Sequence, residues 1–450
     1  MDITEHNIWW FGDINNDPDV KKWRTSKIKW IPKIVDKITL KPFALHFLIG
    51  PRQVGKTTAL KLLIKKLIDN GANPFSIFYF NCDILESYKE LSTVIKSYFK
   101  IRASRHIDSS IIILDEITYP AGWFRAIKHF IDSGKFAKDV IILSGSLSAE
   151  LRGEVETFPG RRGNGRDYYM YPISFKEFLK IYDKRLYSAV REIKSLSYDE
   201  IKKFAEENAY LVEKLNDAFD TYLEAGGFPR SIISKLTKGF VERDVLEDYL
   251  RWIRGDIIIV NKSRETAKRI ARAIIEKSLS KISWHAIAKD YDIPSHATVR
   301  EYIEMFQEMM IAKILYHIDP NKGIVLFRKN KKVHLIDPFY YRLFEYWTGS
   351  KLVNRMETLY EATLIGHLAR DFPTYYWSNS YEVDVVVKLN NRWLPFEVTI
   401  GSVSKKRKYL FSSRAIIITR ESIDTDNYII PLSILLAGYE TGNSRKLSEI

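Results

Sequence analysis

The stretch FALHFLIGPRQVGKTT, residues 43–58, decides the fold. Residues 43–49 form an apolar run that predicts a buried β-strand. Residues 50–57, GPRQVGKT, then match the pattern G-x-x-x-x-G-K-[ST] of a phosphate-binding loop. The residues that follow, up to Gly71, have the spacing of an amphipathic helix, with an apolar face made by Leu60, Leu63, Ile64 and Leu67. Strand, glycine loop and helix thus follow in the order that phosphate binding requires.

The loop predicts a nucleotide site. Its backbone N–H groups and the positive end of the helix are expected to surround the β-phosphate. We expect Lys56 to reach the β- and γ-phosphates and the Thr57 hydroxyl to ligate Mg²⁺, so the expected cofactors are ATP and Mg²⁺. The residues predicted to contact the nucleotide are Gly50, Pro51, Arg52, Gln53, Val54, Gly55, Lys56, Thr57 and Thr58.

A second acidic signal lies at IIILDE, residues 111–116. A continuous aliphatic run is typical of a buried parallel strand, and ligands bind beyond the carboxyl end of such strands. Asp115 is expected to hold Mg²⁺ through water, and Glu116 to orient and deprotonate the attacking water. The alternative is that both acids only cap the next helix. Hydrolysis of ATP, in addition to its binding, is the favoured interpretation.

Two further polar features follow this pair. The strand-like run DVIILSGS, residues 139–146, contains Ser144, which is expected to sense the γ-phosphate or, alternatively, to cap a turn. A glycine-rich loop then carries Arg161, Arg162 and Arg166. An arginine at the phosphates stabilises the charge of the transition state, whereas the alternative is a solvated basic loop.

The composition limits the class of protein. A chain of 450 residues is too long for one ordinary core, so two or three domains are expected. Lys and Arg outnumber Asp and Glu by 70 to 56, and the net charge of +14 suits a polyanionic partner such as nucleic acid. Cys82 is the single cysteine, which excludes an intramolecular disulfide and fits a reducing compartment. With no membrane-spanning apolar run or signal peptide, a cytoplasmic protein without membrane contact is expected.

The middle of the chain is charged and helical over 185–250, and residues 282–307 predict two helices separated by a turn at Pro294. Ser295 is expected to cap the second helix, where His296, Ala297, Thr298 and Arg300 can reach DNA base edges. Glu301, Glu304 and Glu308 on the same helix disfavour phosphate contact, so an internal packing module is the alternative. The predicted packing face consists of Ala286, Ile287, Val299, Ile303 and Phe306.

A hairpin over 381–401 places acids among apolar residues. Glu382 and Asp384 share one face of the first strand, and Glu397 lies on the second. Upstream, residues 356–372 predict a helix whose apolar stripe includes Glu361. A carboxylate on a buried stripe requires a charged partner or a metal.

Eight segments, which span most of the chain, resemble in content and order a group of archaeal-type P-loop ATPases of the AAA-like and STAND assemblage. Members of this group carry a winged helix and a C-terminal PD-(D/E)XK nuclease-like domain. The P-loop is generic, and the succession of YPISFKEF and GGFP is far more specific. The segments are NIWWFGD (7–13), LIGPRQVGKTT (48–58), IIILDEI (111–117), ILSGS (142–146), FPGRR (158–162), YPISFKEF (171–178), YLEAGGFPR (222–230) and VHLIDPFYYRLF (333–344).

The resemblance implies an α/β fold with an AAA-like P-loop core of five strands. It assigns Ser144 to the sensor position and Arg161 to the glycine-arginine pair of the family pattern. The implied catalytic residues are therefore Glu116, Lys56, Ser144 and Arg161. The expected domains are an N-terminal segment (1–40), the ATPase core (41–180), a helical lid and connector (181–260), a winged helix (261–330) and a restriction-endonuclease-like α/β domain (331–450).

Glu361, Asp384 and Glu397 match the acids of that nuclease-like domain, and they form a predicted second metal site for Mg²⁺. Thr399 stands where the family pattern has a lysine. Lys388 lies about 13 Å along the strand from Asp384 and is too distant to replace it. Lys405 and Lys406 are the remaining candidates. An active nuclease, an acid-lined inactive interaction domain and an unrelated hairpin all stay open.

The leading hypothesis is Mg²⁺-dependent ATP hydrolysis that drives a conformational change of a nucleic-acid-associated protein, with DNA as the partner and a degenerate nuclease-like domain. One alternative is a DNA endonuclease gated by ATP. Another is a STAND-like switch that hydrolyses ATP slowly and binds a protein partner. Assembly of the chain into a homo-oligomer is compatible with each of these.

Overall fold

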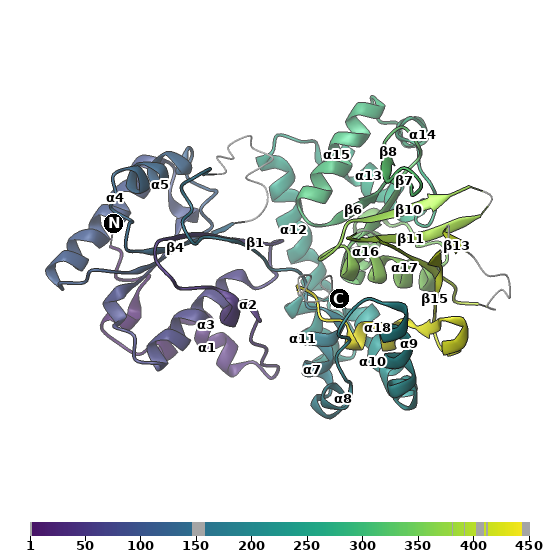
Figure 1. Cartoon of the computed structure of the whole chain (residues 1–450). Coiled ribbons are helices and arrows are strands. Elements are labelled where there is room, and N and C mark those ends of the chain that lie inside the picture. Colours follow the sequence, from purple (N-terminus) through teal and green to yellow (C-terminus); the bar gives the residue numbers. More distant parts are fainter. Residues whose placement is uncertain are drawn as a thin grey trace. The chain divides into compact units, whose positions relative to one another are not determined.

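The computed structural model describes residues 2–145, 158–379, 381–390, 392–401, 409–410 and 413–442. The chain divides into two compact units, residues 1–171 and 172–450 (Figure 1). The boundary between the two units falls near the limit expected at residue 180. Helix α7 (Phe175–Tyr182) follows this boundary.

The first unit is built on a parallel sheet of five strands, in the order β2-β3-β4-β1-β5. The expected strands at 43–49, 111–116 and 139–146 are confirmed, because their aliphatic runs are buried within the sheet. Figure 1 shows α1, α2 and α3 on one side of the sheet and α4 and α5 on the other. The elements are α1 (Pro18–Thr25), α2 (Ile34–Lys37), β1 (Ala44–Ile49), α3 (Lys56–Asp69), β2 (Ile77–Asn81), α4 (Tyr88–Ser104), β3 (Ile111–Asp115), α5 (Trp123–Asp132), β4 (Val140–Gly145) and β5 (Asp167–Tyr169).

The N-terminal segment covers the outer edge of β2. The Asn7 side chain donates to the carbonyl oxygen of Tyr79 at 2.9 Å and accepts from the Tyr79 N–H at 2.7 Å. The indoles of Trp9 and Trp10 both donate to the carbonyl oxygen of Ile77. Residues 1–40 are thus an integral layer of the first unit and not a separate segment.

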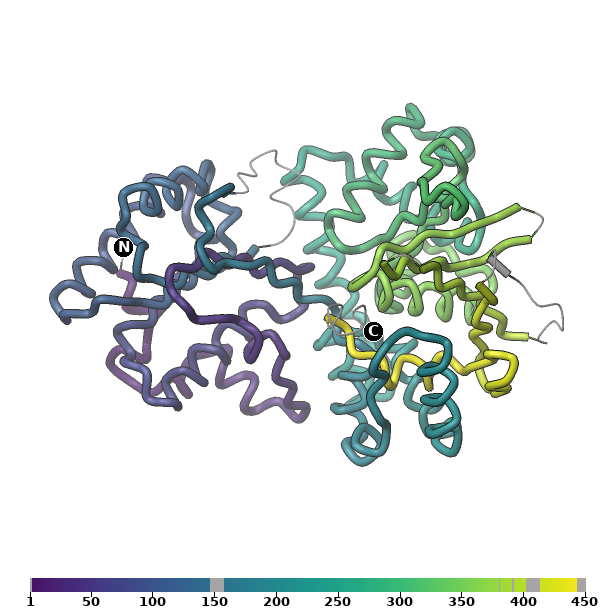
Figure 2. The backbone as a smooth tube through the Cα atoms, in the orientation of Figure 1, coloured from purple at the N-terminus to yellow at the C-terminus, as the bar shows by residue number. Residues whose placement is uncertain are grey.

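The second unit combines helices with one seven-stranded sheet and, in the described residues, two two-stranded sheets. Its first helices are α7, α8 (Lys184–Ala189), α9 (Tyr198–Asn208), α10 (Val212–Ala225), α11 (Pro229–Lys238) and α12 (Arg243–Ile259). Helix α16 (Pro338–Thr348) packs against α10, α12 and α13 (Arg264–Glu276). Figure 2 shows the chain returning at its yellow end, where α18 (Leu432–Gly438) contacts α7, α9 and α10.

Three motifs that are distant in the sequence meet inside the second unit. The Ile173 N–H of YPISFKEF donates to the carbonyl oxygen of Gly227 at 2.7 Å. The Gly227 N–H in turn donates to both carboxylate oxygens of Asp337, at 3.1 and 3.0 Å. Asp337 also accepts from the Phe339 N–H at 2.9 Å and thereby caps α16. Gly226 has a φ of +68°, and a Cβ there would lie 2.3 Å from Asp337 Oδ1, so this position requires glycine.

The two predicted helices around Pro294 are confirmed as α14 (Trp284–Asp290) and α15 (His296–Glu308). Ser295 caps α15 by accepting from the Thr298 N–H at 3.0 Å. Four of the five predicted packing residues are buried, whereas Ala286 is exposed because each helical residue is rotated by about 100° from the one before it. The buried four are Ile287, Val299, Ile303 and Phe306.

Strand pairing differs from the expected domain limits. Strand β6 (Ala312–Leu315) pairs antiparallel with β9 (Lys332–Leu335), so this strand pairing crosses the limit expected at residue 330. Between them, β7 (His317–Asp319) and β8 (Ile324–Leu326) join the other sheet. That sheet has the order β16-β15-β12-β11-β10-β7-β8.

The core of this sheet is a meander preceded by α17 (Arg355–Leu368). Strands β10 (Thr374–Ser378), β11 (Glu382–Leu389) and β12 (Arg392–Val398) are antiparallel neighbours. Strands β15 (Ile416–Thr419) and β16 (Ile429–Pro431) follow in parallel to β12. The short strands β13 (Tyr409–Leu410) and β14 (Ser413–Arg414) form a separate pair.

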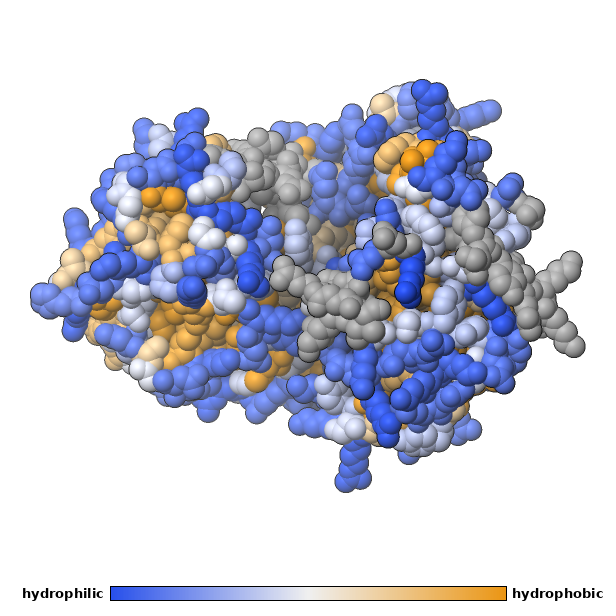
Figure 3. Space-filling view, viewed as in Figure 1, coloured by the Kyte–Doolittle hydropathy of each residue, from blue (hydrophilic) through white to orange (hydrophobic). Residues whose placement is uncertain are grey.

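The surface fits the charged composition. Hydrophilic residues, shown in blue in Figure 3, cover most of the face in view, with smaller hydrophobic patches between them. Among the helices that the structure describes, none is long and apolar enough to span a bilayer.

The junction at Asp337 generates a stability prediction. Asp337→Ala removes the cap of α16 and leaves the buried Gly227 N–H without its acceptor. We expect a loss of about 2–4 kcal/mol in the free energy of unfolding of the second unit, measured by urea denaturation. Asp337→Asn keeps a carbonyl acceptor and should cost clearly less.

Comparison of the parent with Asp337→Asn also gives a pH test. Burial raises the pKa of Asp337 to about 6, although the N–H groups of Phe339 and Gly227 oppose this shift. A raised pKa means that the folded state binds the proton more tightly than the unfolded state. The parent should therefore lose stability relative to Asp337→Asn as the pH rises from about 4 to 6, where the unfolded and folded forms titrate. A stability difference that is constant over this range would contradict the assignment.

Candidate nucleotide site and a buried ion cluster

The phosphate-binding loop connects β1 to α3. Gly55, at the start of α3, has a φ of +103°, and Gln53 has a φ of +62°, so the loop turns through left-handed conformations. A Cβ on Gly50 would lie 2.3 Å from the carbonyl oxygen of Met170, beside β5. Close packing of the loop against the backbone of Met170 therefore requires a glycine at this position.

Lys56 is the first residue of α3, and it is 5% exposed. Its ammonium donates to the carbonyl oxygens of Gly50 at 2.9 Å and of Pro51 at 3.1 Å. The charge is thus held within the curve of the loop, at the positive end of the helix. This arrangement suits a lysine that binds the phosphates of a nucleotide.

The two predicted magnesium ligands lie side by side. The Thr57 hydroxyl donates to Asp115 Oδ2 at 2.7 Å. Asp115 closes β3 and is 1% exposed, and its Oδ1 accepts from the Glu116 N–H at 3.1 Å. A hydroxyl and a carboxylate in contact beside a phosphate loop are the oxygen donors that Mg²⁺ prefers.

Tyr79 is a member of this group that the sequence did not reveal. Its hydroxyl donates to the same Asp115 Oδ2 at 3.0 Å. Burial, and next the charge of Asp115, raise the pKa of Tyr79 well above its usual range, so the phenol remains a donor. The one available signal was a tyrosine in a buried strand, IFYFN, which pairs with β3.

Tyr79 is held in turn by a buried ion pair. The Lys61 ammonium lies 3.6 Å from the centroid of the Tyr79 ring and 2.9 Å from Asp17 Oδ2. Both side chains of the ion pair are 6% exposed. Burial lowers the pKa of Lys61, and the charge of Asp17 opposes this effect. A chain of contacts therefore joins the N-terminal segment to Asp115.

Glu116 and Ser144 flank the same edge of the sheet. Glu116 follows β3 directly and has a φ of +50°, a strained conformation for a residue with a side chain. Ser144 in β4 is fully buried, next to Leu48 of β1, and its carbonyl oxygen accepts from the Ile117 N–H. Within the described part of the chain, the Ser144 hydroxyl has no hydrogen-bond partner.

Arg161 does not join the phosphate loop of its own unit. Its guanidinium donates to Asp132 Oδ1 at 2.6 Å, at the end of α5. Gly163 bridges to Ala44, at the start of β1, whereas the loop follows the end of that strand about 16 Å away. Because β5 runs parallel to β1, the segment before it lies at the opposite edge of the sheet. Arg161 therefore lies at the end of β1 that is far from the phosphate loop of its own unit, and its role at the phosphates stays a prediction.

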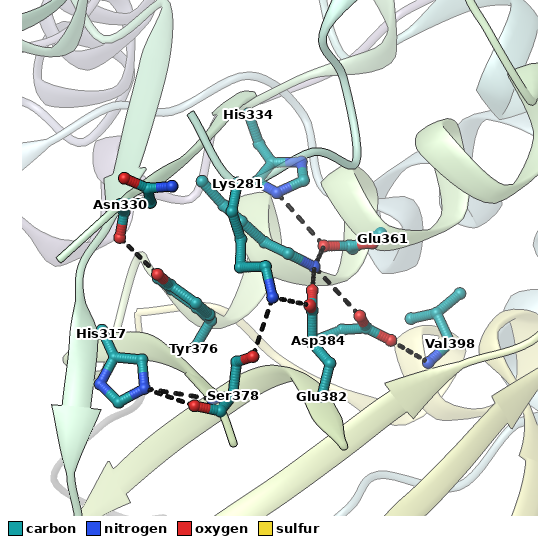
Figure 4. A network of polar contacts seen from close by, with 11 residues as sticks. Lys281, His317, Asn330, His334, Glu361, Tyr376, Ser378, Glu382, Asp384 and Val398 are labelled. Carbon is teal, nitrogen blue, oxygen red and sulfur yellow. Dashed lines mark hydrogen bonds and ion pairs between the residues drawn. The ribbon is translucent and has the colours of Figure 1, made fainter. Parts of the chain in front are cut away.

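The acids of the C-terminal hairpin converge on a lysine from another strand (Figure 4). The ammonium of Lys332, in β9, lies 3.0 Å from Glu361 Oε1, 2.6 Å from Glu382 Oε1 and 3.1 Å from Asp384 Oδ1. His334 Nε2 lies 3.2 Å from the same oxygen of Glu361. Glu361 is thus buried as predicted, and its partner is an ammonium group.

The predicted second metal site is only partly assembled. Glu361 and Asp384 meet at Lys332, with Glu382 as the third acid, while Glu397 is half-buried on β12. In the ranges that the structure describes, no three His, Cys, Asp or Glu side chains form a group able to hold a metal ion. Lys405 and Lys406 lie outside the described residues.

The cluster separates the pKa values of its acids. Burial raises the pKa of Glu361, but the charges of Lys332 and His334 outweigh it and lower the value to about 2. Burial, together with the charge of Glu361, raises the pKa of Asp384 to about 7. The sequence offered one signal for Lys332, since it alternates with His334 along an apolar strand and shares its face.

Comparison with protein families gives two matches. A family described as an AAA domain matches residues 43–179. A second family, described as a domain of unknown function (DUF8612), matches residues 216–345. A search of curated proteins found no match.

Three solved structures align over much of the chain. The ORC2 protein of Aeropyrum pernix, in ADPNP-ADP complexes, is 12% identical over 70% of this chain and 90% of that chain, with a TM-score of 0.36. The ORC1 protein of the same organism, in complex with DNA, is 14% identical over 70% and 89%, with a TM-score of 0.31. The RuvB Holliday junction branch migration motor of Thermotoga maritima is 14% identical over 60% and 81%, with a TM-score of 0.26.

Superpositions this loose establish no common arrangement of the whole chain. The family match, by contrast, covers the phosphate loop, the Asp115-Glu116 pair and the five strands of the parallel sheet. Residues 43–179 thus match an AAA domain and contain the parallel sheet and phosphate loop of a P-loop ATPase.

Proposed function

We propose that this chain hydrolyses ATP with Mg²⁺ and uses the hydrolysis to change the conformation of a nucleic-acid-associated protein. The observation that carries the proposal is the contact of Thr57 with Asp115 beside the loop-bound ammonium of Lys56. These groups supply what a nucleoside triphosphate needs at its β- and γ-phosphates, namely a cation, backbone donors and a pair of magnesium ligands.

In this proposal each residue has a separate task. Thr57 and Asp115 would hold Mg²⁺, which would supply positive charge at the phosphates. Glu116 accepts a proton from the attacking water as the water oxygen bonds to the γ-phosphorus. The bond from that phosphorus to the β,γ-bridging oxygen breaks, and ADP leaves. The buried Ser144 hydroxyl contacts the γ-phosphate and distinguishes ATP from ADP.

The site is tested with Lys56→Ala and Glu116→Gln. We expect Lys56→Ala to lose ATP binding, and Glu116→Gln to bind ATP while its turnover falls by about 10²–10⁴-fold. Nucleotide affinity and phosphate release measure the two effects separately. Lys65→Ala is the matched control, because Lys65 lies on the same helix and pairs with Asp69 at 2.7 Å. Turnover at the parent rate in both site variants would refute the assignment.

Tyr79 generates a second prediction. Removing the hydroxyl with Tyr79→Phe deletes one of two donors that orient Asp115 Oδ2, and loss of such an outer contact typically costs about 10-fold or more in metal affinity. The Mg²⁺ concentration for half-maximal ATPase activity should rise accordingly, with a smaller change in the maximal rate. Tyr98→Phe is the control, since Tyr98 is a buried tyrosine of the same unit that bonds Ser110 and Phe75. An unchanged Mg²⁺ dependence would remove Tyr79 from the site.

DNA is the proposed partner. Helices α13, α14 and α15 with the β6-β9 pair support a winged helix, and the net charge of +14 favours a polyanion. His296, at the start of α15, stacks on His285 with 4.1 Å between ring centroids. The Arg300 side chain is 64% exposed and pairs with Glu304 at 2.7 Å. This neighbouring carboxylate weakens phosphate contact, so the proposal requires that Arg300 contacts a DNA phosphate despite its pairing with Glu304.

Arg300→Glu should therefore weaken binding to duplex DNA and reduce the slope of log affinity against log salt by about 1–2. Fluorescence anisotropy at several salt concentrations measures both quantities. Arg272→Glu is the matched control, because Arg272 is similarly exposed on α13 and pairs with Glu276. Equal losses in the two variants would indicate a general charge effect, and no loss in either would exclude this helix as the DNA contact.

The C-terminal domain is proposed to be a degenerate relative of the PD-(D/E)XK nucleases. The order of α17, the β10–β12 meander and the parallel β15 supports this kinship, as does the meeting of Glu361 with Asp384. Thr399 at the lysine position argues against cleavage. An arginine from a second copy, Arg161 included, remains a proposal that requires a homo-oligomer.

A further inference from the structure

We propose that the acid cluster of Glu361, Glu382 and Asp384 is a cation site filled by the chain's own Lys332, which replaces a divalent metal and fastens β9 to α17 and β11. The inference deepens the proposed degeneracy of the nuclease-like domain. It is independent of ATP hydrolysis in the first unit.

The donors of Lys332 are fully used. A lysine ammonium has three N–H groups and no acceptor. Three carboxylate oxygens surround it at 2.6–3.1 Å, one from α17 and two from β11. Every proton therefore has an acceptor within the chain, and none remains for a water or a phosphate. Lys332 accordingly does not take over the task of the lysine missing at Thr399.

The oxygens are engaged as well. Asp384 uses Oδ1 for Lys332 and Oδ2 for the Val398 N–H at 3.0 Å. Glu382 uses Oε1 for Lys332 and Oε2 for Lys281, which lies 3.0 Å away. Glu361 Oε1 is shared by Lys332 and His334. A metal ion would have to displace these contacts before it could bind.

The charge balance of the cluster also disfavours a bound metal ion. Two ammonium groups, Lys332 and Lys281, face three carboxylates, so at most one negative charge is left uncompensated. Hard divalent cations select sites with several free carboxylate oxygens. An added ion would also meet the ammonium of Lys332 at the shared oxygens, where repulsion is strong because the site is poorly solvated.

Burial fixes the arrangement. The side chains of Lys332 and Glu361 are 2% and 3% exposed, and those of Glu382 and Asp384 are 29% and 18% exposed. The ammonium therefore approaches from the interior while the acids of β11 face the partly open side. The lysine extends from a strand, and its buried ammonium is the counter-ion of these acids.

The cluster thus joins two parts of the second unit. Lys332 belongs to the antiparallel β6-β9 pair, and Lys281 follows α13 at the start of the helix–turn–helix segment. Their carboxylate partners belong to α17 and to the seven-stranded sheet. Acids that resemble metal ligands in the sequence here attach the proposed winged helix to the sheet.

The test measures Mn²⁺ binding to the full chain without nucleotide, by electron paramagnetic resonance of the free ion. The parent and Asp384→Asn should bind the same number of ions with the same affinity. Lys332→Ala and Lys332→Met should each gain one ion, bound at least ten-fold more tightly than any Asp384-dependent ion in the parent. Adding Asp384→Asn should abolish the gain. Lys331→Ala is the control, because the Lys331 ammonium lies over Trp284.

An ion in the parent that is lost in Asp384→Asn would overturn the inference, as would Mg²⁺-dependent DNA cleavage that needs Asp384. Folded Lys332 variants that gain no ion would also overturn it. If neither Lys332 variant folds, the comparison of the parent with Asp384→Asn still decides. ATP turnover by the parent is recorded in parallel, so that a failure of the first unit is distinguished from a failure here.

Discussion

A single buried carboxylate, Asp337, organises the second unit. Its oxygens accept from the Gly227 and Phe339 N–H groups at a fully buried position, where an unpaired backbone donor would be costly. The glycine that it binds also accepts from Ile173, so the segment before α7, the end of α10 and the start of α16 are fixed at one point. Every helix that packs on α10 or α16 depends on this junction. The sequence segments GGFP and IDPF are therefore two halves of one contact.

Both units use a buried lysine as an internal cation. Lys61 lies between Asp17 and the ring of Tyr79, and Lys332 lies among three carboxylates. An unpaired ammonium in such surroundings would be deprotonated or would move toward solvent, because desolvation opposes the charged form. In each case the acids come from different parts of the chain, so the ion pair forms only when those parts are assembled. The lysines therefore favour one arrangement of neighbouring elements over others.

The sequence predicted what contiguous residues determine. The strand, loop and helix around Lys56, the acids after β3 and the cap at Ser295 follow from local periodicity and hydrogen-bonding chemistry. Contacts between residues that are far apart in the sequence were not predicted. Tyr79 meets Asp115 across 36 positions, and Lys332 meets Asp384 across 52, with no periodic signal connecting them. The separation of Arg161 from the phosphate loop of its own unit depends on the direction of β5, which local periodicity does not determine. The prediction that Ala286 is buried was wrong because Ala286 is rotated by about 100° around the helix axis from the buried Ile287.

The cover over β2 has a consequence for assembly. An edge strand normally offers its outward N–H and C=O groups to another chain. Here the outward groups of residues 77 and 79 are already bound to Asn7, Trp9 and Trp10. Copies of this unit are thereby prevented from merging their sheets through β2, and the same residues shield the apolar and aromatic strand IFYFN from aggregation. Copies that meet at this edge must therefore use side-chain surfaces, which can separate and re-form during a nucleotide cycle more readily than a shared sheet.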